Sequence, residues 1–136
     1  MDILSHLHSG LRWVVLFLLL AAIVQAFAGM SGNRPFNRKL ALYALISVHT
    51  QIVIGLIIYF AGSWYQQEDR FFRLEHIMMM LIAALLITIG NARAKRGATD
   101  KAKYKSIAVF FTLGLFLILV SIPWPFMQRF SAYGWF

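Results

Sequence analysis

The sequence has no cysteine, only five acidic residues and only three prolines among its 136 residues. Without cysteine the protein forms no disulfide, no thiolate-bound iron–sulfur cluster and no thiolate zinc site. Histidine, methionine and carboxylate side chains remain as metal ligands. Charged residues make up 13% of the chain, well below the ~25% usual in soluble domains, whereas 60% of the residues are hydrophobic. This composition indicates an integral membrane protein.

Four long apolar runs account for most of the chain. They extend roughly over Leu4–Met30, Leu40–Gly62, Phe71–Asn91 and Ser106–Pro123. Each run is long enough to cross a bilayer as a helix, which takes about 17–25 residues. The connections are short, so consecutive helices should be antiparallel neighbours. The sequence therefore predicts one all-α domain over residues 1–136, an integral membrane four-helix bundle with up-down-up-down topology.

Small residues within these runs are expected to let the helices approach one another closely. They are Gly55, Gly62, Ala83, Ala84, Thr112 and Gly114. The first run has an alternative interpretation, because Ala26-Phe27-Ala28 resembles a signal-peptidase site and residues 1–28 would then be a cleaved signal. Basic residues follow this tripeptide and oppose export, so a retained helix is expected.

The basic residues are concentrated on one side of the predicted bundle. Nine of the 13 lie in the first and third connections, where Asp100 is the one acid: Arg34, Arg38, Lys39, Arg93, Lys95, Arg96, Lys101, Lys103 and Lys105. The positive-inside rule then places both termini on the non-cytoplasmic side of a bacterial inner membrane. The basic side also predicts affinity for anionic lipid. Nothing besides charge supports nucleic-acid binding, which is not expected.

Three of the four histidines are candidate ligands, whereas His6 is expected to be an interfacial polar residue. At a rise of about 1.5 Å per residue, His8 lies near the outer start of the first helix and His76 roughly 9 Å below the outer start of the third. His49 lies roughly 15 Å from the inner start of the second helix, near mid-membrane. Ionisable groups in a membrane usually face a partner or a cofactor inside the protein.

Two inward-facing histidines at similar depth are typical of a non-covalent b-type haem site. His8 with His76 is the favoured pair, because the first and third helices can face each other diagonally. His49 with His76 is the alternative. If His49 is outside the pair, it serves a second cofactor, forms a hydrogen bond with Thr50 or Gln51, or contacts a quinone.

Two arginines accompany the histidines of the favoured pair. Arg12 follows His8 by four residues and Arg73 precedes His76 by three, so each shares a helix face with its histidine. Arginine binds carboxylate groups through two parallel hydrogen bonds, so both could hold haem propionates. The alternative is that both side chains extend to lipid headgroups.

Several motifs carry a resemblance that covers nearly the whole chain. They are His6-Leu7-His8-Ser9-Gly10-Leu11-Arg12-Trp13, His49-Thr50-Gln51 with Gly55 and Tyr59-Phe60, Glu75-His76-Ile77-Met78-Met79, Ile87-Thr88-Ile89-Gly90, Ile122-Pro123-Trp124-Pro125-Phe126 and Gly134-Trp135-Phe136. With them the chain resembles a small bacterial family of four-helix membrane proteins labelled cytochrome b or cytochrome b-like. The resemblance implies a bound haem b and implies that His8, His49 and His76 are the matching histidines.

The first functional hypothesis is an inner-membrane haem b protein for electron transport. It would move electrons between quinol and an outer acceptor, alone or as a subunit of a respiratory complex. The second hypothesis is a non-redox membrane subunit or small transporter, in which His8, Glu75 and His76 form a metal or proton site. The third is a haem-free structural subunit. Phosphate-binding loops, nucleophile elbows and zinc-protease motifs are absent, so any enzymatic role is that of an oxidoreductase component.

Overall fold

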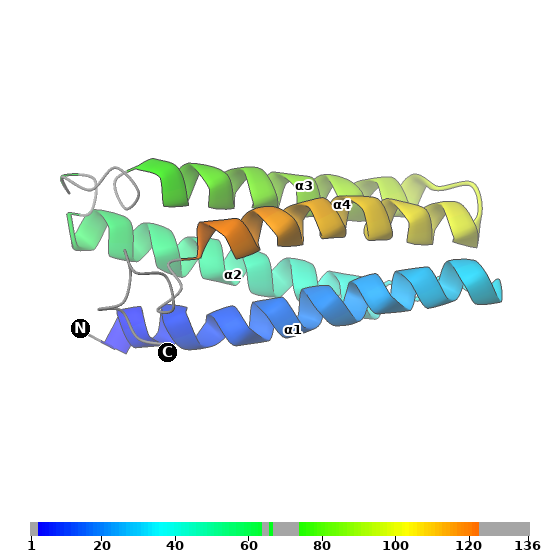
Figure 1. Ribbon diagram of the computed structural model, residues 1–136, viewed down its shortest axis with the longest axis horizontal. Coiled ribbons are helices and arrows are strands. Elements are labelled where there is room, and N and C mark those ends of the chain that lie inside the picture. Colours follow the sequence, from blue (N-terminus) through cyan, green and yellow to red (C-terminus); the bar gives the residue numbers. More distant parts are fainter. Residues whose placement is uncertain (1–2, 64–65, 67–73, 123–136) are drawn as a thin grey trace.

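The computed structural model describes residues 3–63, 66 and 74–122, and within these residues it contains four helices (Figure 1). They are α1 (Ile3–Gly32), α2 (Lys39–Ala61), α3 (His76–Arg96) and α4 (Asp100–Ser121). Each is long and apolar enough to cross a membrane. The prediction of an all-α bundle of four such helices is confirmed, and this architecture is typical of a multi-pass membrane protein. The side of the membrane on which the termini lie stays a prediction.

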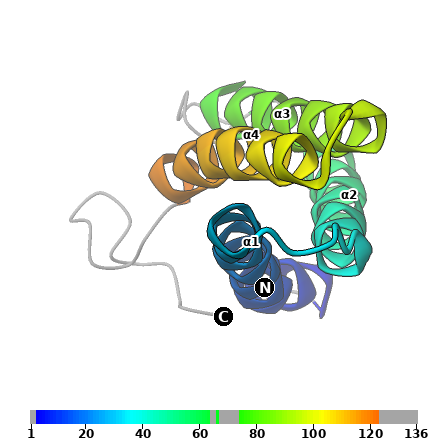
Figure 2. The same ribbon diagram turned by 90° about the vertical axis from the view of Figure 1, so that its right-hand side faces the viewer.

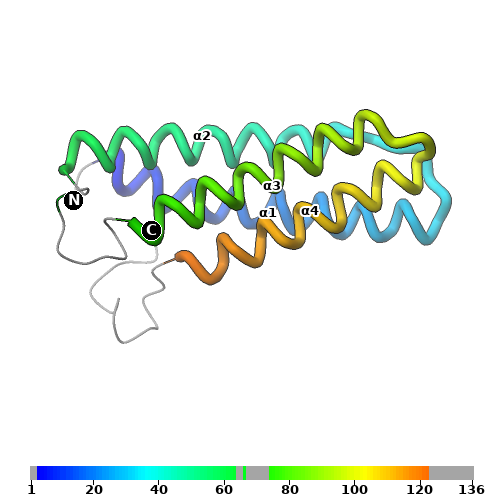
Figure 3. Tube along the Cα trace, turned by 90° about the horizontal axis from the view of Figure 1, so that it is seen from above, coloured from blue at the N-terminus to red at the C-terminus, as the bar shows by residue number. Residues whose placement is uncertain are grey.

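Consecutive helices run in opposite directions and form a four-sided bundle (Figures 1 and 3). Both α1 and α3 pack against α2 and against α4. The pairs α1–α3 and α2–α4 therefore lie on the two diagonals of the bundle, as the end view in Figure 2 shows. The N-terminal part of α1 and the start of α3 meet at one end, and the basic residues of the first and third connections lie at the other.

Small residues line the helix contacts, which allows the backbones to approach closely. Ala83, Ala84 and Gly114 are buried as predicted, whereas Gly62 and Thr112 are exposed. A methyl group placed on Gly114 would lie 2.6 Å from Ile87 Cγ1, so the absence of a side chain on α4 sets the spacing between α3 and α4.

The outer surface of the bundle is apolar on every helix. Large exposed hydrophobic side chains include Phe17 on α1, Val53 on α2, Leu85 on α3 and Phe116 on α4. In water such an apolar surface would lead to association. Lipid chains are as apolar as these side chains, so a bilayer is the solvent that this surface fits.

Two helix boundaries at the basic end differ from the prediction. α3 ends at Arg96 instead of near Asn91, and α4 begins at Asp100 instead of Ser106. The basic residues expected in this third connection therefore lie in helical turns, and the connection is only residues 97–99. The expected start of the third helix, Phe71, lies outside the described residues.

Both helices extend beyond the apolar runs because their polar end residues themselves favour helical structure. Lysine and arginine are good helix formers. Basic side chains in the last turn of α3 also interact favourably with the negative end of the helix dipole. At the start of α4 the Thr99 side chain accepts a hydrogen bond from Ala102 N at 3.1 Å, which caps the helix.

Candidate cofactor site

His8 and His76 lie side by side at the end of the bundle opposite the basic residues. Their ring centroids are 6.5 Å apart and the ring planes are inclined by 79°. His8 belongs to α1 and His76 is the first residue of α3, so the two rings meet across a diagonal of the bundle. Helix geometry places both in the bundle interior, where each is partly buried.

The orientation of His76 is fixed by the end of α4. His76 Nδ1 lies 2.8 Å from the carbonyl oxygen of Ser121. A carbonyl only accepts hydrogen bonds, so Nδ1 carries a proton and donates it. In a neutral imidazole the lone pair is then on Nε2, the atom that can bind a metal. Ser121 is the last residue of α4, and its carbonyl has no partner further along the helix.

His8 is held mainly through its backbone. Gln51 Nε2 on α2 donates to His8 O at 2.7 Å. Among the described residues, His8 Nδ1 and Gln51 Oε1 are both buried without a hydrogen-bond partner. Gly55 makes room for the imidazole, because a methyl group on Gly55 would lie 3.1 Å from His8 Cε1. The ring is thus tightly placed and has hydrogen-bonding or ligating capacity left over.

Arg12 is the charged member of this site. It lies one turn after His8 on α1, and only 9% of its surface is exposed. Its guanidinium carbon is 5.3 Å from the centre of the Trp13 ring, and its positive charge acts on both imidazole rings. Arg73, predicted as the second propionate partner, lies outside the described residues.

His49 is not brought to the His8–His76 pair. Its Nε2 lies 3.0 Å from Thr88 Oγ1 on α3. At 1.5 Å per residue, Thr88 is about 18 Å along α3 from His76. Thr88 Oγ1 donates to Ala84 O at 2.7 Å, so its proton is used and His49 Nε2 must be the donor. The His49 side chain is exposed on the outside of the bundle, with a lone pair on Nδ1.

Of the three alternatives given for His49, the hydrogen bond with Thr50 or Gln51 is not formed, because His49 bonds Thr88. Residues one and two positions apart on a helix do not face each other. Thr50 Oγ1 instead donates to Ile46 O at 2.8 Å, and Gln51 reaches α1.

The structure does not bring His8, Glu75 and His76 together as the three-ligand metal site of the second hypothesis, and the proton-site form of that hypothesis stays a prediction. Among the described residues, no group of three or more His, Cys, Asp or Glu could hold a metal ion. Glu75 is exposed, one position before the start of α3. A bare ion would therefore find two imidazoles, whereas protein-held ions usually have three or four protein ligands.

A haem iron makes a smaller demand, because the tetrapyrrole supplies its equatorial ligands and the protein adds one or two axial ones. Two imidazoles on opposite sides of one metal have ring centres about 6 Å apart when each metal–nitrogen bond is near 2.0 Å. The observed 6.5 Å is close to this value. The spare nitrogen capacity of His8 and the buried guanidinium of Arg12 also suit a cofactor that carries a metal and carboxylates. The residues present thus supply two imidazoles and a cation, the groups that would hold a haem.

Three members of the site were not predicted from the sequence: Gln51 as the partner of His8, Gly55 as its packing surface, and the Ser121 carbonyl. Pro123 was a usable signal for the last of these, since a helix that ends before proline leaves carbonyl groups without amide partners. The other two depend on how α1 and α2 are aligned, which hydrophobic runs do not determine.

Comparisons of the chain with protein-family models, with curated proteins and with solved structures find no match. The resemblance to cytochrome b-like membrane proteins therefore stays an interpretation of the sequence motifs.

Proposed function

We propose that the protein is a membrane haem b protein that transfers electrons, in which His8 and His76 would hold the haem iron. The observation that carries this proposal is the meeting of these two imidazoles across a diagonal of the bundle, with ring centroids 6.5 Å apart. A second support is that the chain has no cysteine. Without a thiolate, histidine is the strong side-chain ligand that remains for a haem iron.

The surroundings of His76 support a ligand role. Metal-binding histidines usually donate their other ring N–H to a backbone carbonyl or a carboxylate, which fixes the tautomer and the ring orientation. The hydrogen bond from His76 Nδ1 to Ser121 O has this form. His8 would complete the pair from α1, with Gly55 and Gln51 holding its position.

Arg12 would bind a propionate of the haem. A buried cation is stabilised by a carboxylate at short range, and the guanidinium offers two parallel donors to it. In this proposal Arg73 is the counterpart of Arg12 next to α3. Arg12 belongs to the end of the bundle that the charge pattern predicts on the non-cytoplasmic side, and Arg73 precedes α3 in the sequence.

A bound haem b supplies a one-electron redox couple whose potential depends on its axial ligands. The chain's own part is to hold the ring, to exclude water and to keep both imidazoles neutral and oriented. The proposal places the protein in a bacterial inner membrane between quinol and an outer-side acceptor, alone or with other respiratory subunits. The exposed His49, with its acceptor atom Nδ1 directed away from Thr88, is the proposed contact for quinol from the bilayer.

The test is a reduced-minus-oxidised visible spectrum of the purified protein, with haem quantified per chain. We expect a low-spin b-type spectrum and about one haem per chain, as two axial histidines imply. His8→Ala and His76→Ala should each lose haem or its low-spin spectrum. His49→Ala is the matched control, since it also removes a histidine from a span, and it should keep both.

Added imidazole gives a further control, because it should restore the low-spin spectrum of His76→Ala if that variant is folded. Protein made in haem-replete cells that shows no Soret band would refute the proposal. Wild-type haem content in His8→Ala and His76→Ala would refute the ligand assignment. A colourless protein that retains a metal would instead favour the non-redox alternative.

A further inference from the structure

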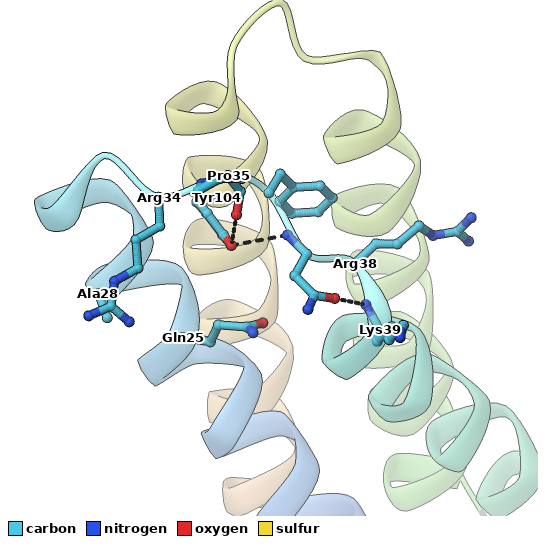
Figure 4. Close-up of a pocket in the computed structure, with 9 residues that line it drawn as sticks. Gln25, Ala28, Arg34, Pro35, Arg38, Lys39 and Tyr104 are labelled. Carbon is cyan, nitrogen blue, oxygen red and sulfur yellow. Dashed lines mark hydrogen bonds between the residues drawn. The ribbon is translucent and has the colours of Figure 1, made fainter.

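A cavity of about 670 Å³ lies at the basic end of the bundle, between the end of α1 and the start of α2. Gln25 and Ala28 line it from α1, Arg34 and Arg38 from the connection, and Lys39 from the first turn of α2. Figure 4 shows Arg34 beside Ala28 and Lys39 on the other side, with Gln25 between them. This cavity is at the opposite end of the bundle from His8 and His76, so it is separate from the proposed haem site.

The connection that forms one wall of the cavity is anchored to α4. The Tyr104 hydroxyl donates to Pro35 O at 2.7 Å and accepts from Asn37 N at 3.0 Å, as Figure 4 shows. Asp100 Oδ1 accepts a hydrogen bond from Phe36 N at 3.0 Å. Three consecutive residues are therefore fixed by one helix. The basic side chains on either side of them start from a defined backbone, which lowers the entropy lost when they bind a ligand.

The cavity carries an excess of positive charge. None of Arg34, Arg38 and Lys39 is paired with a carboxylate within the part of the chain that the structure describes. In that part, Asp100 is the one carboxylate at this end, and its Oδ1 already binds the backbone of Phe36. Arginine and lysine bind phosphate oxygens through charge-assisted hydrogen bonds. The chemistry of the lining thus selects a phosphate group.

Exposed apolar side chains adjoin the cavity on α1 and α2, on the side that faces the middle of the predicted membrane spans. Val24 precedes Ala28 by four residues, and Tyr43 follows Lys39 by four, so each lies one helical turn deeper on the same face as a lining residue. Val24 is 59% exposed and Tyr43 is 54% exposed. A polar cavity at the helix ends that continues into exposed apolar surface matches an amphiphile, with a charged head and hydrocarbon chains.

We infer that this cavity binds the headgroup of an anionic phospholipid, with the phosphate between Arg34 and Lys39 and the acyl chains along Val24 and Tyr43. The site differs from a general attraction of the basic end for lipid, because only some of the basic residues line the cavity. Lys101 and Lys105 are exposed at the same end of the bundle but outside it.

The test compares two double variants of the full chain in mild detergent by native mass spectrometry, with equal amounts of phosphatidylglycerol and phosphatidylcholine. We expect the wild-type protein to retain phosphatidylglycerol selectively. Arg34→Gln/Lys39→Gln should weaken this binding about 25-fold, because each cation near an anionic lipid contributes roughly fivefold. Lys101→Gln/Lys105→Gln removes the same charge and should weaken it less than about threefold, because its charges act through solvent.

Equal losses in the two double variants would show a diffuse electrostatic effect and overturn the site, and so would wild-type binding in Arg34→Gln/Lys39→Gln. Ala28→Trp is a second test, because it keeps every charge but fills the cavity, and it should also exclude the lipid. Unchanged lipid binding in Ala28→Trp would overturn the inference. Excess inorganic phosphate should not displace the lipid. Displacement would show that a free anion is the ligand and would overturn the lipid assignment.

Discussion

Replacing Tyr104 by phenylalanine should destabilise the fold while leaving its packing intact. The Tyr104 ring is 3% exposed and makes an edge-to-face contact with Phe36, with ring centroids 5.0 Å apart. These contacts do not involve the hydroxyl group. The hydroxyl makes two hydrogen bonds, to Pro35 O and from Asn37 N, and both connect α4 to the segment between α1 and α2.

The expected loss follows from these two bonds. A hydrogen bond in a protein contributes about 1 kcal/mol net, and leaving a buried partner without one costs about 1–3 kcal/mol. Pro35 is exposed, so water can replace the hydroxyl at its carbonyl. We expect Tyr104→Phe to lower the free energy of unfolding by roughly 1–3 kcal/mol, an estimate built from these bond values.

Reversible unfolding in mixed micelles, followed by circular dichroism, measures this difference. Hydrogen exchange at the Asn37 amide gives a local readout, and exchange should be faster in the variant. Tyr43→Phe is the control, because Tyr43 is 54% exposed and the same atom is removed. If Tyr104→Phe and Tyr43→Phe have equal stability and the Asn37 amide exchanges at the wild-type rate, the connection is not held by Tyr104 and the reasoning fails.

Two glycine substitutions test contacts elsewhere in the bundle. Gly114→Ala places a methyl group 2.6 Å from Cγ1 of the buried Ile87, so α3 and α4 must separate, and unfolding measurements should show a loss of about 1–3 kcal/mol. Gly10→Ala meets nothing within 4 Å and should be neutral or stabilising, and an equal loss there would contradict the packing argument. Gly55→Ala places a methyl group 3.1 Å from His8 Cε1. It should shift the visible spectrum or weaken haem retention without changing the fold, and an unaltered spectrum would contradict the assigned contact.

The four-helix fold could be predicted because a membrane imposes a length on each helix and the sequence records that length as an apolar run. The ends of the helices were harder to predict. The turns around Arg93 and Lys103 extend past the apolar runs, and their helical structure depends on helix propensity, the helix dipole and the Thr99 cap instead of hydrophobicity. A hydrophobic pattern therefore underestimates helices that continue beyond the bilayer.

The candidate site was predictable in part for a related reason. His8 and His76 could be placed at one end of the bundle because depth follows from residue counts. The direction of each side chain around its helix could not be obtained in that way, and His49 therefore remained an alternative partner of His76. The structure shows that His49 points to Thr88. The hydrogen bond to Ser121 involves a backbone carbonyl, a group that every residue has, so Pro123 signalled only that carbonyl groups at this helix end are free and not that His76 binds one.

The fourth helix has no histidine, yet both ends of the bundle depend on it. Near its start, Tyr104 and Asp100 shape the connection between α1 and α2. At its end, the Ser121 carbonyl orients His76. The first three helices can enter a membrane before α4 follows them, but at that stage the basic cavity has no fixed wall and His76 has no fixed orientation. The last helix thus completes the surroundings of the proposed haem site and of the proposed lipid site together.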